Sequence, residues 1–160
     1  MRGLSLERMR EQVAFVEGSD ILIGTLVENV RVGRSHLSPG DVRDALRVVG
    51  LLGVVYDLPH GLDTPMTPSG GPLSASQALR LGIARALIGR PRLLILDGVL
   101  DAIDFRNCPD LLPRLFDRSA PWTLLVASTN PAVVGMCDRI ISLPPVAIPD
   151  LATTVSQGKP

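Results

Sequence analysis

Lysine is nearly absent from this sequence: 15 of its 16 basic residues are arginines, and Lys159, next to the C-terminal Pro160, is the one exception. A function that requires a lysine ammonium group therefore has a single candidate residue. Cysteine is also scarce, because only Cys108 and Cys137 are present and they form no C-x-x-C spacing. That scarcity argues against a zinc or dithiol redox site and predicts two reduced thiols.

Long apolar runs are missing as well. No uninterrupted run reaches the roughly 20 residues of a membrane-spanning helix, and the N-terminus lacks the apolar segment of a signal peptide. We therefore expect a cytoplasmic protein that meets a membrane only through a partner. The 16 acidic residues balance the 16 basic ones, so the formal net charge is zero and no nucleic acid is expected as a ligand.

The 160 residues, 46% of them hydrophobic, have the composition of one globular domain. Short apolar runs predict β-strands at residues 12–16, 92–97, 122–127 and 139–143. The second and third runs are almost continuously apolar, which is typical of strands buried on both faces of a sheet. The tail at residues 144–160 carries four prolines among small and polar residues and predicts an extended or disordered segment.

Helix-start signals separate these runs. They predict helices that begin near Thr25, after Ser38, after Ser74, near residue 109 and after Asn130. Strands that alternate with helices predict an α/β fold with a parallel sheet and right-handed crossovers.

Three segments carry a specific resemblance. Residues 70–77 (GGPLSASQ), 80–87 (RLGIARAL) and 91–97 (PRLLILD) resemble, in order and spacing, the signature-to-Walker-B region of ATP-binding cassette (ABC) domains. Residues 24–30 (GTLVENV) and 58–64 (LPHGLDT) resemble the exporter branch of that family.

The resemblance extends from about Leu4 to Leu143. It implies that residues 1–143 form a partial ABC ATPase domain: a P-loop NTPase-like parallel sheet flanked by helices, with a helical subdomain at about residues 25–90, lacking the Walker A strand and loop. Residues 144–160 lie outside the resemblance.

The family's signature motif LSGGQ matches residues 73–77, with Ala75 and Ser76 in place of its two glycines. In the family this loop approaches the γ-phosphate of a nucleotide held by the opposite subunit, and glycines permit a close backbone approach. The substitutions are expected to weaken that approach. The resemblance assigns nucleotide contacts to Leu73, Ser74, Ala75, Ser76, Gln77, Asp97 and Asp104.

Asp97 matches the Walker B aspartate and is the expected Mg²⁺ ligand if nucleotide is bound. Gly98 stands where the family has the glutamate that polarises the attacking water, and Thr129 stands where it has the histidine that contacts the γ-phosphate. Glycine has no side chain to accept a proton, and threonine carries no charge. No catalytic residue is therefore intact. Residues 101–104 match the D-loop, with Asp104 in its terminal place.

The sequence has no G-x-x-x-x-G-K-[ST] phosphate loop, because Lys159 is followed by Pro160 and not by serine or threonine. The loop and the aromatic residue that stacks on adenine would lie before Met1. Either the gene is short at its start or the reading frame begins at an internal methionine. ATP and Mg²⁺ are expected only together with the phosphate loop of a partner.

Other residues have structural interpretations or none. The glutamine that links the nucleotide to the transport domain would fall at Glu17 or Gly18, and no residue is assigned to it because the loop is one residue short. We interpret His36 and His60 as solvated loop residues. Arg80 and Arg85 are interpreted as cations on a helix surface, and Tyr56 and Trp122 as residues in or near the core.

Two functions of different classes fit the sequence equally. In the first, the chain is a partial ABC ATPase domain that pairs with a complete cassette subunit or a transporter membrane domain and supplies only the signature side of a composite site. In the second, it is a non-enzymatic remnant or interaction module that keeps the fold without its chemistry. In neither case do we expect the isolated chain to hydrolyse ATP. A place at the inner face of the membrane depends on the partner.

The family's sheet predicts that strands 12–16, 92–97 and 122–127 lie side by side in that order, all parallel. The phosphate-loop strand of the family would lie next, before strand 139–143. Without it, either 139–143 closes the gap or 122–127 is left with an open edge. In both cases we expect low stability and self-association.

Overall fold

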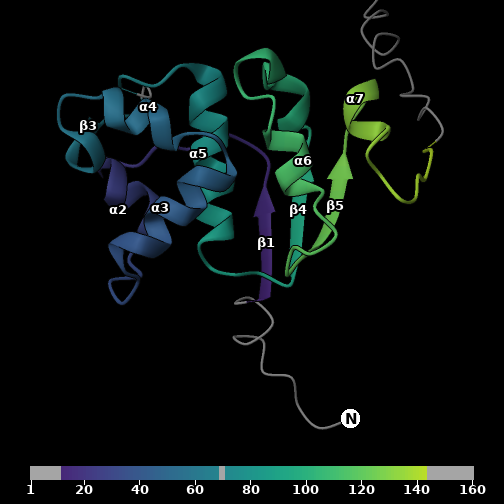
Figure 1. Ribbon diagram of the computed structural model, residues 1–160, viewed down its shortest axis with the longest axis horizontal. Coiled ribbons are helices and arrows are strands. Elements are labelled where there is room, and N and C mark those ends of the chain that lie inside the picture. The colour runs from purple at the N-terminus through teal and green to yellow at the C-terminus, as the bar shows by residue number, and fades with distance from the viewer. Residues whose placement is uncertain (1–11, 69–70, 144–160) are drawn as a thin grey trace, which may run out of the picture.

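The computed structural model describes residues 12–68 and 71–143, and its strands form two small sheets (Figure 1). The strands, in chain order, are β1 (Val13–Val16), β2 (Gly24–Thr25), β3 (Pro65–Met66), β4 (Leu93–Asp97) and β5 (Thr123–Ala127). The larger sheet has the order β1-β4-β5, and both neighbouring pairs are parallel. The antiparallel pair β2-β3 forms the other sheet. The predicted order and direction of the three long strands are confirmed.

Helices separate the strands as the sequence predicts. In the described residues they are α2 (Leu26–Arg31), α3 (Pro39–Val48), α4 (Leu52–Asp57), α5 (Ala75–Leu87), α6 (Leu111–Leu115) and α7 (Pro131–Val134), with 3-10 helices η1 (Gly61–Asp63), η2 (Val99–Ala102) and η3 (Phe105–Asn107). Capping boxes begin α2, α3 and α5: an N-cap hydroxyl accepts a hydrogen bond from the third helical N–H, and the side chain of that third residue accepts one from the N-cap N–H. These three helix starts are therefore encoded locally.

The helix α5 is the centre of the core. It lies between β1 on one side and α2 and α3 on the other (Figure 1), and its Leu81, Ile83 and Ala84 are fully buried. Gly82 permits the close approach to the sheet, because a Cβ there would lie 3.1 Å from the carbonyl oxygen of Gly18. The N-terminus of α5 lies on the same side as the carboxyl ends of the parallel strands (Figure 1).

Helices of the described residues cover one face of the larger sheet. On that face Val16, Leu94 and Leu96 are buried. On the opposite face Phe15 is 54% exposed and Leu125 is 55% exposed. The prediction that β4 and β5 are buried on both faces is therefore wrong, because apolar composition does not reveal whether a second layer of helices is present.

The run at residues 139–143 forms no strand, so that prediction is wrong as well. A strand there needs a hydrogen-bonding neighbour, and among the described residues β5 pairs only with β4. The edge of β5 consequently stays open, which is one of the two outcomes that the sequence allowed. The tail predicted to be disordered, 144–160, lies outside the described residues.

Two arginines of α5 are not the surface cations that the sequence suggested. Arg80 is 3% exposed and donates to the carbonyl oxygens of Val49 at 3.2 Å and Gly50 at 3.0 Å. Arg85 is half-buried, and its Nε donates to the carbonyl oxygen of Asn29 at 2.9 Å. Long side chains of this kind tie α5 to α2 and to the end of α3, which helical periodicity alone could not predict.

Of the two predicted core aromatics, one is exposed and one packs against the core. Tyr56 is 69% exposed, so its predicted core position is wrong. Trp122 packs against the core and donates to the carbonyl oxygen of Leu115 at 3.1 Å, as expected. His36 and His60 are exposed in turns, and both cysteines are free. Within the described ranges no helix has the length and apolar character to cross a membrane.

Candidate functional site

The segment 73–77 forms the start of α5. Leu73 is buried and anchors the segment in the core, while Ser74 and Ala75 are exposed. Ser74 N–H donates to Gln77 Oε1 at 2.8 Å, and Ser74 Oγ accepts from Gln77 N–H at 3.3 Å. The first turn of a helix has N–H groups without an intrahelical acceptor, and it is the positive end of the helix dipole. Both apply to the start of α5, a helix of 13 residues. In this structure Ser74 and Gln77 serve as a helix cap.

Asp97 and Gly98 lie at the carboxyl end of β4. Asp97 is exposed and in register with Ala127, and the Gly98 N–H donates to the Ala127 carbonyl oxygen at 3.0 Å. Gly98 has φ 65°, in the left-handed region that favours glycine. A Cβ at this position would meet no atom within 4 Å. A glutamate here would therefore have room but would strain the backbone.

Asp101 joins η2 to the loop after β5. Its Oδ2 accepts hydrogen bonds from the Thr129 N–H at 2.8 Å and the Thr129 Oγ1 at 2.9 Å, and its Oδ1 accepts one from the Ser128 hydroxyl. The Ser128 hydroxyl, the Thr129 N–H and the other donors of this loop lower the pKa of the Asp101 carboxyl group below its ordinary value. Thr129 is therefore held by the protein's own carboxylate.

Asp104 is engaged at both its backbone and its side chain. The Asp104 N–H donates to Ser76 Oγ at 3.4 Å, which connects η2 and η3 to α5. Its carboxylate accepts from the Arg106 Nε at 3.0 Å and the Asn107 Nδ2 at 2.9 Å. The Arg106 guanidinium lowers the pKa of the Asp104 carboxyl group most strongly. Both acidic ends of segment 101–104 are thus held by hydrogen bonds.

These segments lie at the carboxyl ends of the strands, where open α/β sheets bind ligands. In the described residues, no hydrogen bond or ion pair links Ser74 or Gln77 to Asp97. Asp97 offers one exposed carboxylate, which suits a Mg²⁺ ion held mainly by phosphate oxygens and water. The same residues contain neither a group of three side chains able to hold a metal nor a lysine. They suit one part of a Mg²⁺–nucleotide site and do not form a whole one.

Sequence reasoning missed the role of Asp101. It placed this residue in the D-loop but assigned nothing to its side chain, because its partners Ser128 and Thr129 are 27 and 28 positions away. A local signal was present, since Asp101 lies just beyond one parallel strand and Ser128 just beyond the next. Adjacent parallel strands bring such positions to the same edge of a sheet.

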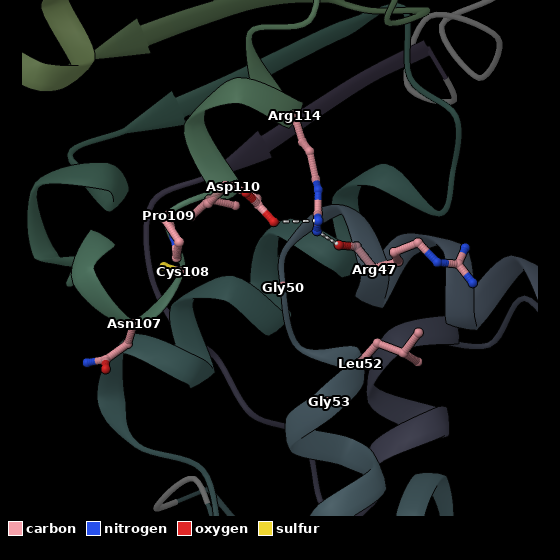
Figure 2. Close-up of a pocket in the computed structure, with 10 residues that line it drawn as sticks. Arg47, Gly50, Leu52, Gly53, Asn107, Cys108, Pro109, Asp110 and Arg114 are labelled. Carbon is pink, nitrogen blue, oxygen red and sulfur yellow. Dashed lines mark hydrogen bonds and ion pairs between the residues drawn. The ribbon is translucent and has the colours of Figure 1, made fainter.

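A cavity of about 320 Å³ lies between the α3–α4 turn and the start of α6 (Figure 2), and its wall residues Asn107 and Cys108 hydrogen-bond to Asp104. Arg114 lies across it and donates to the Arg47 carbonyl oxygen and, at 2.8 Å, to Asp110 Oδ2. Cys108 is in the wall, and burial raises the pKa of its thiol, which keeps it protonated and weakly nucleophilic. Arg114, which lies across the cavity, hydrogen-bonds to the protein's own groups, so the cavity is not a candidate active site.

Known proteins with similar sequences include several ABC transporter ATP-binding proteins. The chain is 33% identical over 142 residues to the uncharacterized ABC transporter ATP-binding protein YwjA of Bacillus subtilis, covering 88% of this chain and 25% of that protein. It is 36% identical over 141 residues to the ABC transporter ATP-binding protein RamA of Streptomyces coelicolor, covering 88% of this chain and 22% of RamA. It is 35% identical over 144 residues to an ATP-dependent lipid A-core flippase of Ralstonia nicotianae, with 88% and 24% covered.

A solved structure shares the fold. A bacterial Atm1-family ABC exporter with ATP bound matches 81% of this chain and 23% of its own length, with a TM-score of 0.73 and 24% sequence identity. No family model matches the chain. The chain spans about a quarter of the length of the curated relatives that it matches.

Proposed function

Since the chain is homologous to ABC transporter ATP-binding proteins and corresponds to part of such a domain, we propose that it supplies the signature side of a composite nucleotide site and does not hydrolyse ATP alone. In this proposal residues 1–143 act as one partial ATPase domain, in which about residues 25–90 form the helical subdomain.

One observation carries the proposal. The start of α5 is exposed and capped by Ser74, beside segment 101–104, whereas Gly98 offers no side chain to accept a proton. The signature side of a site is therefore presented without a catalytic base. The residues proposed to contact nucleotide are those of segment 73–77 together with Asp97 and Asp104, and Asp97 is the proposed Mg²⁺ ligand.

The proposed partner is a complete cassette subunit or a transporter membrane domain, which would also bring the chain to the inner face of the membrane. An exposed apolar surface near the start of α2 supports a protein partner, because Ile23 is 84% exposed and Leu22 is 45% exposed. Both lie in the wall of a depression of about 420 Å³. ATP and Mg²⁺ would be bound jointly with the phosphate loop of a cassette partner.

The test is binding to a complete ABC ATPase subunit whose own catalytic glutamate is replaced, so that bound ATP persists. We expect Mg-ATP to strengthen binding of this chain, and Ala75→Glu, which places a charge where phosphate would lie, to remove that increase. The matched control is Tyr56→Glu, also exposed but on α4. No binding in the presence of ATP would contradict the proposal.

The alternative, a non-enzymatic remnant or interaction module, is favoured by the uncovered sheet face around Phe15 and Leu125. The same experiment separates the two functions. An interaction module would bind equally with and without Mg-ATP, and Ala75→Glu would leave its affinity unchanged.

A further inference from the structure

Two side chains that depart from the family's residues contact the same short segment. Ser76 occupies a glycine position of the signature, and Thr129 occupies the histidine position after β5. In the structure both reach segment 101–104, Ser76 at the Asp104 end and Thr129 at the Asp101 end. The substituted residues are therefore neighbours of one element, although 53 positions separate them in the sequence.

The Asp101 end is the more strongly held. Its carboxylate accepts from two hydroxyl groups and one backbone N–H of the loop at residues 128–130, and hydrogen bonds to a charged acceptor are stronger than neutral ones. A histidine at position 129 would lack the hydroxyl group that donates to Asp101 Oδ2. The Thr129 hydroxyl thus adds a contact that the residue typical of the family could not make in this form.

The Asp104 end depends on Ser76. Its hydroxyl oxygen accepts the Asp104 N–H at 3.4 Å, and a glycine at position 76 would leave that N–H without this acceptor. The contact is longer than those at Asp101 and contributes less. It nevertheless joins the first turn of α5 to the segment, so the start of α5, segment 101–104 and loop 128–130 are continuous through hydrogen bonds.

We propose that Ser76 and the Asp101–Thr129 pair hold segment 101–104 at both ends, so that the candidate site keeps one arrangement without nucleotide. The segment then has the same arrangement with and without nucleotide. Independent loss of the motif residues would instead leave the new side chains without a common partner. The inference rests on the proposed function only in treating these segments as one site, and no partner is needed to test it.

The test is amide hydrogen exchange of the full chain, measured residue by residue by NMR without nucleotide. In Asp101→Ala we expect the amides of Thr129 and Asn130 to exchange about fivefold faster or more, while amides in α3 are unchanged. Asp117→Ala is the matched control, because Asp117 also accepts from an N–H and a hydroxyl, those of Ser119, but only within its own turn. It should leave loop 128–130 unchanged.

Two further results decide the proposal. In Ser76→Gly the Asp104 amide should exchange faster, and combining Ser76→Gly with Thr129→Val should change exchange in the segment by more than the product of the single effects. Adding Mg-ATP to the unmodified chain should change none of these rates. The proposal is overturned if Asp101→Ala leaves the Thr129 amide as in the unmodified chain, if the two variants act independently, or if the loop becomes protected only when Mg-ATP is added.

Discussion

Arg80 is the one charged side chain among the described residues that is almost completely buried, at 3% exposed. It donates to two carbonyl oxygens at the end of α3, and no Cβ at Gly50 separates it from that turn. We expect Arg80→Ala to lower the free energy of unfolding by about 2 kcal/mol or more, because it leaves a cavity and two carbonyl oxygens without their donor. Urea denaturation measures this change.

The control for that prediction is Arg118→Ala. Arg118 forms an ion pair with Asp138, and its side chain is 87% exposed, whereas Arg80 is buried. We expect a change within about 0.5 kcal/mol, because exposed ion pairs contribute little. Equal effects of the two substitutions would show that Arg80 is not held as described.

Asp101 predicts a pH dependence. Its pKa is lowered in the folded protein, so the folded state favours the ionised carboxylate. The resulting stabilisation is fully present above the ordinary aspartate pKa of about 3.9 and is lost as the pH falls through the lower folded value. Denaturation at a series of acidic pH values should therefore show a smaller loss of stability in Asp101→Asn than in the unmodified chain. Identical curves would contradict the hydrogen-bond network at Thr129.

A glutamate at position 98 should not be enough to give the chain ATP hydrolysis. We expect Gly98→Glu alone to give no ATP hydrolysis, because a base without a positioned phosphate has nothing to act on. The substitution should also cost about 1 kcal/mol of stability, since a glutamate at φ 65° is strained. Hydrolysis by this variant as an isolated chain, measured by phosphate release, would show that a phosphate site exists without the lysine loop.

At the scale of elements, β5 is one of the two edge strands that the larger sheet has in the described residues, and β1 is the other. Its backbone groups on one side are unpaired in the described residues, and Leu125 adds apolar surface on the uncovered face. We expect low stability and concentration-dependent self-association, which Leu125→Lys should reduce because a charge on an edge strand opposes pairing. Tyr56→Lys, at a site on α4 that is also exposed, should leave association unchanged.

Sedimentation velocity over a range of concentrations measures this association. A monodisperse monomer with a cooperative thermal transition in the ordinary mesophile range would contradict the prediction.

Locally encoded elements could be predicted, and elements that depend on a distant neighbour could not. The starts of α3 and α5 follow from Ser38 and Ser74, each with its third helical residue, so four letters suffice. Residues 139–143 have the composition of a strand but no neighbouring strand in the part of the chain that the structure describes. The exposure of Phe15 depends on a layer of helices that composition does not specify. The candidate site divides in the same way: its segments were found by motif spacing, while the contact between Asp101 and Thr129 needed the register of β4 and β5.

At the scale of the whole molecule, the start of α5, the end of β4 and segment 101–104 lie at the carboxyl ends of the parallel strands (Figure 1). In the described residues, helices cover one face of this sheet and leave the other exposed. We propose that this arrangement is the signature side of a composite nucleotide site. The described residues contain no lysine, and Gly98 provides no base. In the proposed function a cassette partner supplies the phosphate loop and the catalytic base.

The most direct measurement is Mg²⁺-dependent ATP hydrolysis by the purified chain, compared with buffer and with Asp97→Ala. We predict no phosphate release above the buffer control from either protein, because loss of the phosphate loop and of the base commonly raises the barrier by several kcal/mol each. Turnover by the unmodified chain at the rate of ordinary cassette ATPases, abolished by Asp97→Ala, would contradict the account.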